Sequence, residues 1–159
     1  MENGSRYGSL EIIRFLHENR TEGCSEYGMN VSAFNGFLDI LKYKHYNKIG
    51  GCSKPAMDNA TGFGHFEILQ FLHYNRSEGC SGRAMDNACS NGHLHIAKFL
   101  HENRTEGCSK RAMDMAIHNG DLECVKFLHF NRTEGCSKDN RTLHKEYYIS
   151  NSKIKTRQS

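Results

Sequence analysis

Long apolar runs are missing from this chain of 159 residues. A helix needs roughly 20 consecutive apolar residues to cross a bilayer, so the sequence argues against a membrane-spanning protein. The first residues, MENGSRYGSLEII, also lack the apolar core of a secretory signal peptide. We therefore expect a soluble cytoplasmic protein that does not bind membranes.

Motifs for known chemistry are missing as well. The sequence contains no G-x-S-x-G, H-E-x-x-H, phosphate-binding loop or paired-carboxylate pattern. Its single proline, Pro55, falls at the start of a predicted helix, where proline is tolerated. We predict that the protein is not an enzyme, and that it has neither a catalytic residue nor a cofactor.

An excess of positive charge is missing from most of the chain. Residues 1–137 hold 15 Lys and Arg against 16 Asp and Glu, a net charge of −1, whereas residues 138–159 hold 6 against 2, a net charge of +4. Nucleic-acid-binding surfaces gather cations, so we expect no nucleic-acid partner. The basic residues within 150–159 are expected to belong to a disordered tail.

The chain has instead a strict internal repeat. Five registers of one 28-residue unit follow one another without an insertion. The residues at equal positions are Leu10, Leu38, Phe66, Leu94 and Leu122; Gly8, Gly36, Gly64, Gly92 and Gly120; His17, His45, His73, His101 and His129; and Cys24, Cys52, Cys80, Cys108 and Cys136. A unit this short cannot enclose a core, so it must bury its apolar face against its neighbours. We predict an all-α solenoid over residues 1–137.

Each unit has the pattern of two helices and a loop. An apolar set that includes Ala84 and Ala88 follows Ser81, a good N-cap, and Gly92 ends this first helix after about two turns. A longer, more apolar second helix follows, and then the polar loop NRTEG. Second helices are expected near residues 10–19, 38–47, 66–75, 94–103 and 122–131, and a final helix that caps the array is expected within 138–149.

These units resemble a known family. The series AMDNACSNGHLHIAKFL, with its variants KPAMDNATGFGHFEILQFL and KRAMDMAIHNGDLECVKFL, is similar to the two-helix part of the ankyrin repeat. Met-Asp stands where that family usually has leucine-histidine, and the NRTEGCS-type unit is 28 residues long instead of about 33. The shortfall falls where the family carries a β-hairpin finger, so we expect the finger to be reduced to a turn.

The resemblance implies a non-catalytic module that binds another protein on a concave face. In the family, this face is built from the start of each first helix and from the two residues before its closing glycine. Carried onto this chain, these positions are Glu26, Phe34, Asn35, Lys54, Gly62, Phe63, Gly82, Ser90, Asn91, Lys110, His118 and Asn119. Phe34 and Phe63 are the preferred anchors, because each breaks the small or polar pattern at its position. The alternative is that both rings fill gaps between neighbouring first helices.

The repeated cysteines and histidines have structural interpretations. Stacked helices lie about 8 to 10 Å apart, so equivalent cysteines are too distant for a disulfide or a shared zinc ion. We expect free thiols that fill the packed interior, including Cys89 and Cys124, and we expect no bound metal; a redox-reactive thiol is the alternative. The five histidines end the second helices, where a partly charged imidazole interacts favourably with the helix dipole.

The first two units depart from the pattern. Residues 1–7 are a poor first helix, so an array that starts there exposes an apolar flank, and the chain could alternatively be a structural fragment of a longer array without a partner of its own. The second unit has Tyr43 and Lys44 where Phe and Leu are usual. We expect Lys44 to extend outward into solvent and to leave a weak joint. The protein is expected to be a monomer.

Overall fold

The computed structural model describes residues 2–19, 25–138 and 140. Ten helices and no strand occur in these residues, and none of the helices is long and apolar enough to cross a membrane. The helices are α1 (Glu2–Tyr7), α2 (Leu10–Asn19), α3 (Tyr27–Asn35), α4 (Leu38–Tyr46), α5 (Lys54–Gly62), α6 (Phe66–Asn75), α7 (Arg83–Ser90), α8 (Leu94–Asn103), α9 (Lys110–His118) and α10 (Leu122–Asn131). The predicted all-α class is confirmed.

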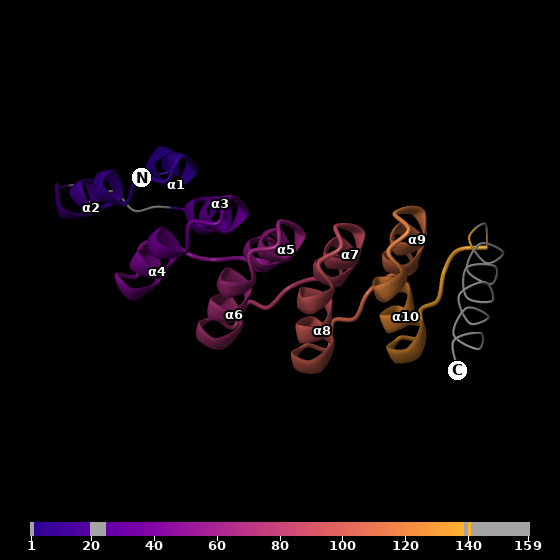
Figure 1. The fold of residues 1–159 in the computed structure, drawn as a ribbon. Helices are drawn as coiled ribbons and strands as arrows, with labels where there is room; N and C mark the ends of the chain where they lie inside the picture. Colours follow the sequence, from indigo (N-terminus) through magenta and orange to yellow (C-terminus); the bar gives the residue numbers. More distant parts are fainter. Residues whose placement is uncertain (1, 20–24, 139, 141–159) are drawn as a thin grey trace, which may run out of the picture.

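Helix pairs are stacked side by side in the order of the sequence (Figure 1). The first helices α1, α3, α5, α7 and α9 form one row, in which each contacts the next. Their partners α2, α4, α6, α8 and α10 form a second row, and each second helix packs against the first helix of its own unit. Contacts therefore join a unit mainly to itself and to its neighbours, which is the architecture of a solenoid.

Glycine ends the first helices because the chain must turn sharply there. Gly36 and Gly64 have φ values of 80° and 77°, in the left-handed region that L side chains rarely adopt. A Cβ atom on Gly36 would also lie 2.7 Å from the ring of His65, and one on Gly64 would lie 2.8 Å from the ring of His93. The turn and the close approach of the next unit both require glycine.

Small residues on the first helices and larger ones on the second helices form the core. The buried residues of one unit are Ala84, Met85, Ala88, Cys89, Ile96, Ala97 and Leu100, and their equivalents in the neighbouring units are also buried. Alanine at two of these positions lets the first helices approach closely, while isoleucine and leucine supply most of the apolar area removed from water. Cys52 and Cys80 are buried with them, and Cys108 and Cys136 are partly buried.

The loop between units contains a charge pair in place of a hairpin. Residues 104–109 form no strand, which agrees with the expected loss of the finger. The guanidinium of Arg104 donates two hydrogen bonds to the carboxylate of Glu106, and Arg76 with Glu78 and Arg132 with Glu134 repeat the arrangement. A Cβ atom on Gly79 would collide with the guanidinium of Arg104, so this side chain lies directly against the preceding loop.

The structure corrects the prediction for Lys44. Its side chain is fully buried, with an exposed fraction of 0%. Lys44 occupies the position of Leu72 and Leu100, where the Cβ atom points into the stack, so the aliphatic stem fills the place of leucine. The following loop also differs, since Ile49 is buried and its N–H donates a hydrogen bond of 2.9 Å to the carbonyl of Lys44.

At the N-terminal end, α1 occupies the position of a first helix despite its polar sequence. The hydroxyl of Ser25 donates a hydrogen bond to the carboxylate of Glu2, in the same register as the bonds that join later units. At the other end, nearly all of the predicted capping helix (138–149) and the whole predicted tail (150–159) lie outside the described residues, as does Cys24.

Candidate functional site

The predicted binding residues lie at the two ends of the first helices. Glu26 precedes α3, and Lys54 and Lys110 are the first residues of α5 and α9. At the opposite ends lie Phe34, Asn35, Gly62, Phe63, Ser90, Asn91, His118 and Asn119, each in the last turn or directly after it. Residues four and seven or eight apart share one side of a helix, so both ends of a first helix can contribute to one surface. We call the exposed side of α3, α5, α7 and α9 the first-helix face.

Two aromatic rings meet on the first-helix face. The ring centroids of Phe34 and Phe63 are 4.2 Å apart with an interplanar angle of 56°. The rings remain 42% and 52% exposed, respectively. Such a pair contributes about 0.5 to 1.5 kcal/mol beyond the burial of area. The rings therefore bridge α3 and α5, as the gap-filling alternative expects, and also leave about half of their surface open to solvent.

A groove opens beside this pair. It has a volume of about 300 Å³ and is lined by Arg6, Tyr27, Asn30, Val31, Phe34, Asn35 and Asn59. Tyr27 is 45% exposed, and its hydroxyl accepts a hydrogen bond of 3.3 Å from Arg6. Aromatic and aliphatic walls with a few amide groups suit an apolar side chain of a ligand and its polar backbone. The residues come from α1, α3 and α5, so the groove depends on the stacking of three units.

Three of the predicted residues are asparagines that bond to the preceding first helix. The side-chain amide of Asn91 donates a hydrogen bond of 2.9 Å to the carbonyl of Gly62, and that of Asn119 donates one of 2.6 Å to the carbonyl of Ser90. Asn35 reaches the carbonyl of Arg6 at 3.3 Å in the same way. These asparagines join α3, α7 and α9 to the preceding first helix.

Phe63 interrupts this series of asparagines. At this joint, a ring nitrogen of His65 lies 3.1 Å from the carbonyl of Phe34 and takes over the contact. Phe63 therefore does not join α5 to α3 through a side-chain hydrogen bond, and its ring can contact a ligand.

Aspartate–serine bonds join the units more tightly, and sequence reasoning missed them. The two carboxylate oxygens of Asp86 accept hydrogen bonds of 2.7 Å from the backbone N–H and the hydroxyl of Ser109. Asp58 does the same for Ser81, at 2.8 and 2.7 Å. The repeated Met-Asp pair in the sequence could have indicated these bonds, because a carboxylate next to buried methionines needs a hydrogen-bond partner.

The loop carboxylates have lowered pKa values and the nearby thiols have raised ones. The guanidinium of Arg104 lowers the pKa of Glu106 to about 2, and Arg132 does the same for Glu134. Burial raises the pKa of the Cys80 thiol to about 11 and that of Cys108 to about 12. A protonated thiol is a poor nucleophile and a poor metal ligand, so these cysteines have the properties of packing residues.

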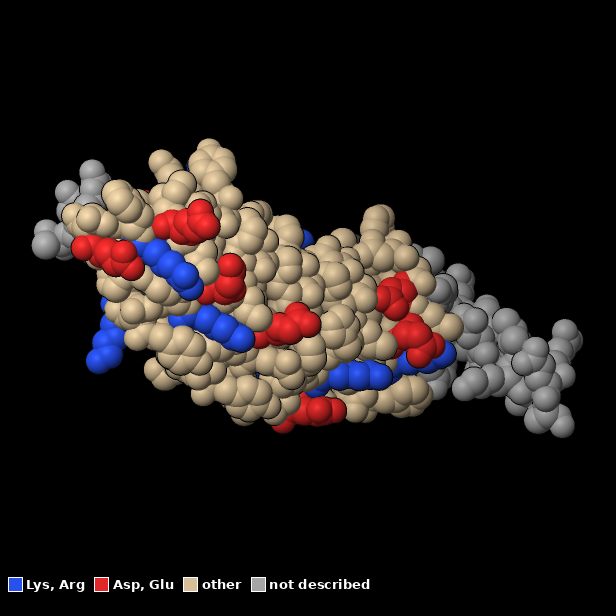
Figure 2. Space-filling model, turned by 60° about the vertical axis from the view of Figure 1, so that its left-hand side comes forward, with Lys and Arg blue, Asp and Glu red and all other residues tan. Residues whose placement is uncertain are grey.

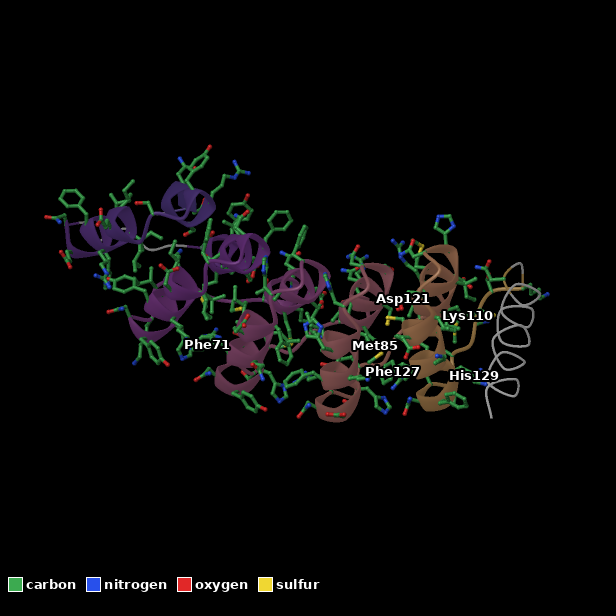
Figure 3. The ribbon with its side chains drawn as sticks, in the orientation of Figure 1. Phe71, Met85, Lys110, Asp121, Phe127 and His129 are labelled. Carbon is green, nitrogen blue, oxygen red and sulfur yellow. The ribbon has the colours of Figure 1, made fainter. Side chains whose placement is uncertain are left out.

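The repeated histidines pack between second helices. The rings of His73 and Phe99 make an edge contact with centroids 5.3 Å apart, and those of His101 and Phe127 are 5.6 Å apart; Figure 3 shows Phe127 on the side of α10 that faces α8. The Nδ1 atoms of His45, His73 and His101 are buried without a hydrogen-bond partner among the described residues. Burial, together with Arg104, lowers the pKa of His73. The partial charge predicted for this histidine is therefore wrong, because the uncharged ring is the favoured form.

Within the described residues, no group of three or more His, Cys, Asp or Glu side chains could hold a metal ion. Charges of both signs are interspersed on the face seen in Figure 2. Within these residues, a ligand would meet a surface of aromatic, amide and charged side chains.

Residues 56–142 match the family model for ankyrin repeats, with three copies. No curated protein matches the chain.

Proposed function

Because the chain belongs to the ankyrin repeat family, whose repeats generally serve as protein-interaction modules, we propose that it is a non-catalytic module that binds a partner protein on the first-helix face. Phe34 and Phe63 are the anchors of this interaction. The supporting observation is the pair of touching rings that remain about half exposed beside a groove of about 300 Å³.

These two rings can contribute more binding energy than the side chains at the other predicted positions. Binding energy in protein interfaces concentrates in a few large side chains, most often aromatic ones, that become fully desolvated. Phe34 and Phe63 still have apolar area to bury, whereas Asn91 and Asn119 already use their amide groups within the array. The asparagines, with Glu26, Lys54, Ser90, Lys110 and His118, would form the polar rim of the interface.

The test is affinity capture from the source cells with quantitative mass spectrometry. The array with Phe34→Ser and Phe63→Ser is compared with the unchanged array and with a control that carries Tyr46→Ser and Tyr74→Ser. The control removes two exposed aromatic rings from the second helices, where they are 67% and 68% exposed. We expect specific partners to be lost only from the Phe34/Phe63 variant, while circular dichroism shows unchanged helix content.

Two results would contradict the proposal. Equal capture by all three proteins would place the binding surface elsewhere, and loss only from the tyrosine variant would place it on the second helices. If no protein is captured specifically by the unchanged array, the alternative of an array with a structural role and no partner of its own gains support.

A further inference from the structure

The first-helix face has two chemically different halves. Around α3 and α5 it presents Tyr27, Val31, Phe34 and Phe63. Around α7 and α9 the registers of Tyr27 and Val31 hold Arg83, Asn87, Arg111 and Met115, and the registers of Phe34 and Phe63 hold Ser90, Asn91, His118 and Asn119. We propose that the partner contributes a linear segment with one aromatic or large aliphatic residue for the first half and acidic residues for the second. This inference rests on the proposed function.

The apolar half is built to receive one large side chain. Tyr27, Val31 and Phe34 lie four and three residues apart, so their side chains share one side of α3, and all three line the groove. The amide of Asn59 lies in the same lining. Such an amide can hydrogen-bond the backbone of an extended segment whose side chain enters the groove.

The basic half consists of Arg83, Lys110 and Arg111, with Lys54 at its border. All four residues are exposed, and none forms an ion pair with an acidic side chain among the described residues. The nearest acidic positions in the first helices, Asp58, Asp86 and Asp114, bond to serines of the following unit. The positive charges are therefore not neutralised within the described part of the array.

These cations also stand where helices disfavour them. Each lies in the first turn of a helix, at the positive end of the macrodipole, where a basic residue is unfavourable. Acidic groups of a bound partner would relieve this repulsion as well as pair with the side chains. Electrostatic complementarity of this kind fixes the register and direction of a bound segment.

The spacing of the two halves defines the ligand further. Neighbouring helices lie about 10 Å apart, and eight helical residues span about 12 Å. The path from Phe63 to Arg83 or Arg111 is then about 15 to 25 Å, which an extended chain covers in roughly five to eight residues. The acidic residues should follow or precede the anchor by that number of positions.

A protein segment fits this surface better than a nucleic acid does. Residues 1–137 carry one more acidic than basic residue. The basic half holds only a few cations, whereas nucleic-acid binding draws on an extended basic surface. Single-stranded RNA, which combines phosphates with bases that stack on aromatic rings, is the competing ligand that the experiment must exclude.

The experiment is selection of random dodecapeptides displayed on phage by the full chain, followed by fluorescence anisotropy on the best peptide. We expect enriched peptides to carry an aromatic or large aliphatic residue with acidic residues five to eight positions away. Arg83→Glu with Arg111→Glu should weaken the best peptide by more than tenfold. The matched control, Lys98→Glu with Lys126→Glu, makes the same change of charge on α8 and α10 of the same units and should alter the affinity less than twofold.

The outcomes separate this inference from the proposed function. Peptides that need Phe34 and Phe63 but lack acidic enrichment would overturn the inference and leave the proposed function standing. If no enriched peptide depends on Phe34 and Phe63, both fail. A fluorescein-labelled 12-nucleotide single-stranded RNA should not bind; tighter binding of RNA than of the best peptide, lost in the Arg83/Arg111 variant, would overturn the inference in favour of a nucleic-acid ligand.

Discussion

The second and fourth units show how differently the same 28-residue pattern can be used. In the fourth unit, Asp86 accepts two short hydrogen bonds from Ser109, and Arg104 and Glu106 close the loop. In the second unit, Asn30 replaces the aspartate and reaches the N–H of Ser53 only at 3.4 Å, although its amide donates a bond of 2.7 Å to the serine hydroxyl.

The loop of the second unit is different as well. Lys48 and Gly50 stand where the other loops have an arginine–glutamate pair, and Lys48 has a positive φ of 55°. The same unit carries Phe34 and most of the groove. Residues that recur in the regular third, fourth and fifth units therefore build the joints, while residues that break the pattern build most of the candidate binding surface.

The largest expected effect is on the packing of the regular units. Leu100 of α8 is buried against α7, so Leu100→Ala should lower the free energy of unfolding by about 2 to 5 kcal/mol. Tyr43→Ala in the second unit should cost clearly less, because Tyr43 is only partly buried and its hydroxyl bonds to His17 at 3.1 Å. Chemical denaturation measures both values, and the reverse ranking would show that the joints are assigned wrongly.

The next effect concerns the bonds between units. Asp86→Ala removes an acceptor for two hydrogen bonds and leaves the N–H of Ser109 without a partner, so it should cost about 2 to 3 kcal/mol. Asn30→Ala should cost about 1 kcal/mol, because its bonds are uncharged and one of them is long. Urea titrations measure both free energies of unfolding. Equal losses in the two variants would mean that aspartate stabilises the joint no more than asparagine does.

The sequence predicts the fold far better than it predicts these joints. The period of 28 residues, the closing glycines and the apolar registers require only local geometry, and they led to the correct all-α solenoid. The bond between Asp86 and Ser109 joins residues 23 positions apart, and it can be recognised only when neighbouring units are placed against each other. The packing of Arg104 against Gly79 of the preceding loop is hidden for the same reason.

Two errors have a shared physical cause. The outward path expected for Lys44 and the charge expected for His73 both came from rules for isolated residues. In the array, the position of a residue within the unit determines its environment. The stem of Lys44 points inward because it occupies a leucine position, and the ring of His73 is covered by the next second helix. The role of Phe34 and Phe63 as anchors stays a prediction, because it depends on a partner.

Acid should weaken the regular units in a defined range of pH. The pKa of Glu106 and of Glu134 falls from 4.5 to about 2 on folding, so their stabilising contribution is present above about pH 4.5 and is lost as the pH falls towards 2. The variant Glu106→Gln with Glu134→Gln should be less stable than the unchanged protein at pH 7, and the gap should shrink between pH 4.5 and 2. Denaturant midpoints across this range check the trend, and a gap that does not change with pH would exclude these carboxylates as its source.

His73 should add a smaller effect at higher pH. Its pKa is lowered in the folded protein, so the unfolded chain binds the proton more readily, and stability should begin to fall as the pH drops below about 6.5. His73→Phe should remove this part of the pH dependence in the same titration. If the stability of His73→Phe and of the unchanged protein depended on pH in the same way above pH 5, the lowered pKa of His73 would be contradicted.

The smallest expected effect is that of removing metal or blocking thiols. The raised pKa values of Cys52, Cys80 and Cys108 should make alkylation of the folded protein slow, and a chelator should leave the melting temperature unchanged. Mass spectrometry after brief iodoacetamide treatment and thermal melts with EDTA measure these two quantities. A chelator-induced loss of helical signal would reveal a metal site, and fast alkylation would favour a redox-reactive thiol.

The most direct measurement is photocrosslinking in the source cells. The photoreactive residue p-benzoylphenylalanine replaces Phe63 on the first-helix face in one protein and Tyr74 on the second helices in another, both of which are exposed aromatic positions. We expect a defined partner protein to be crosslinked from position 63 and not from position 74. Crosslinks from position 74 alone, or the same adducts from both, would contradict a binding surface on the first helices.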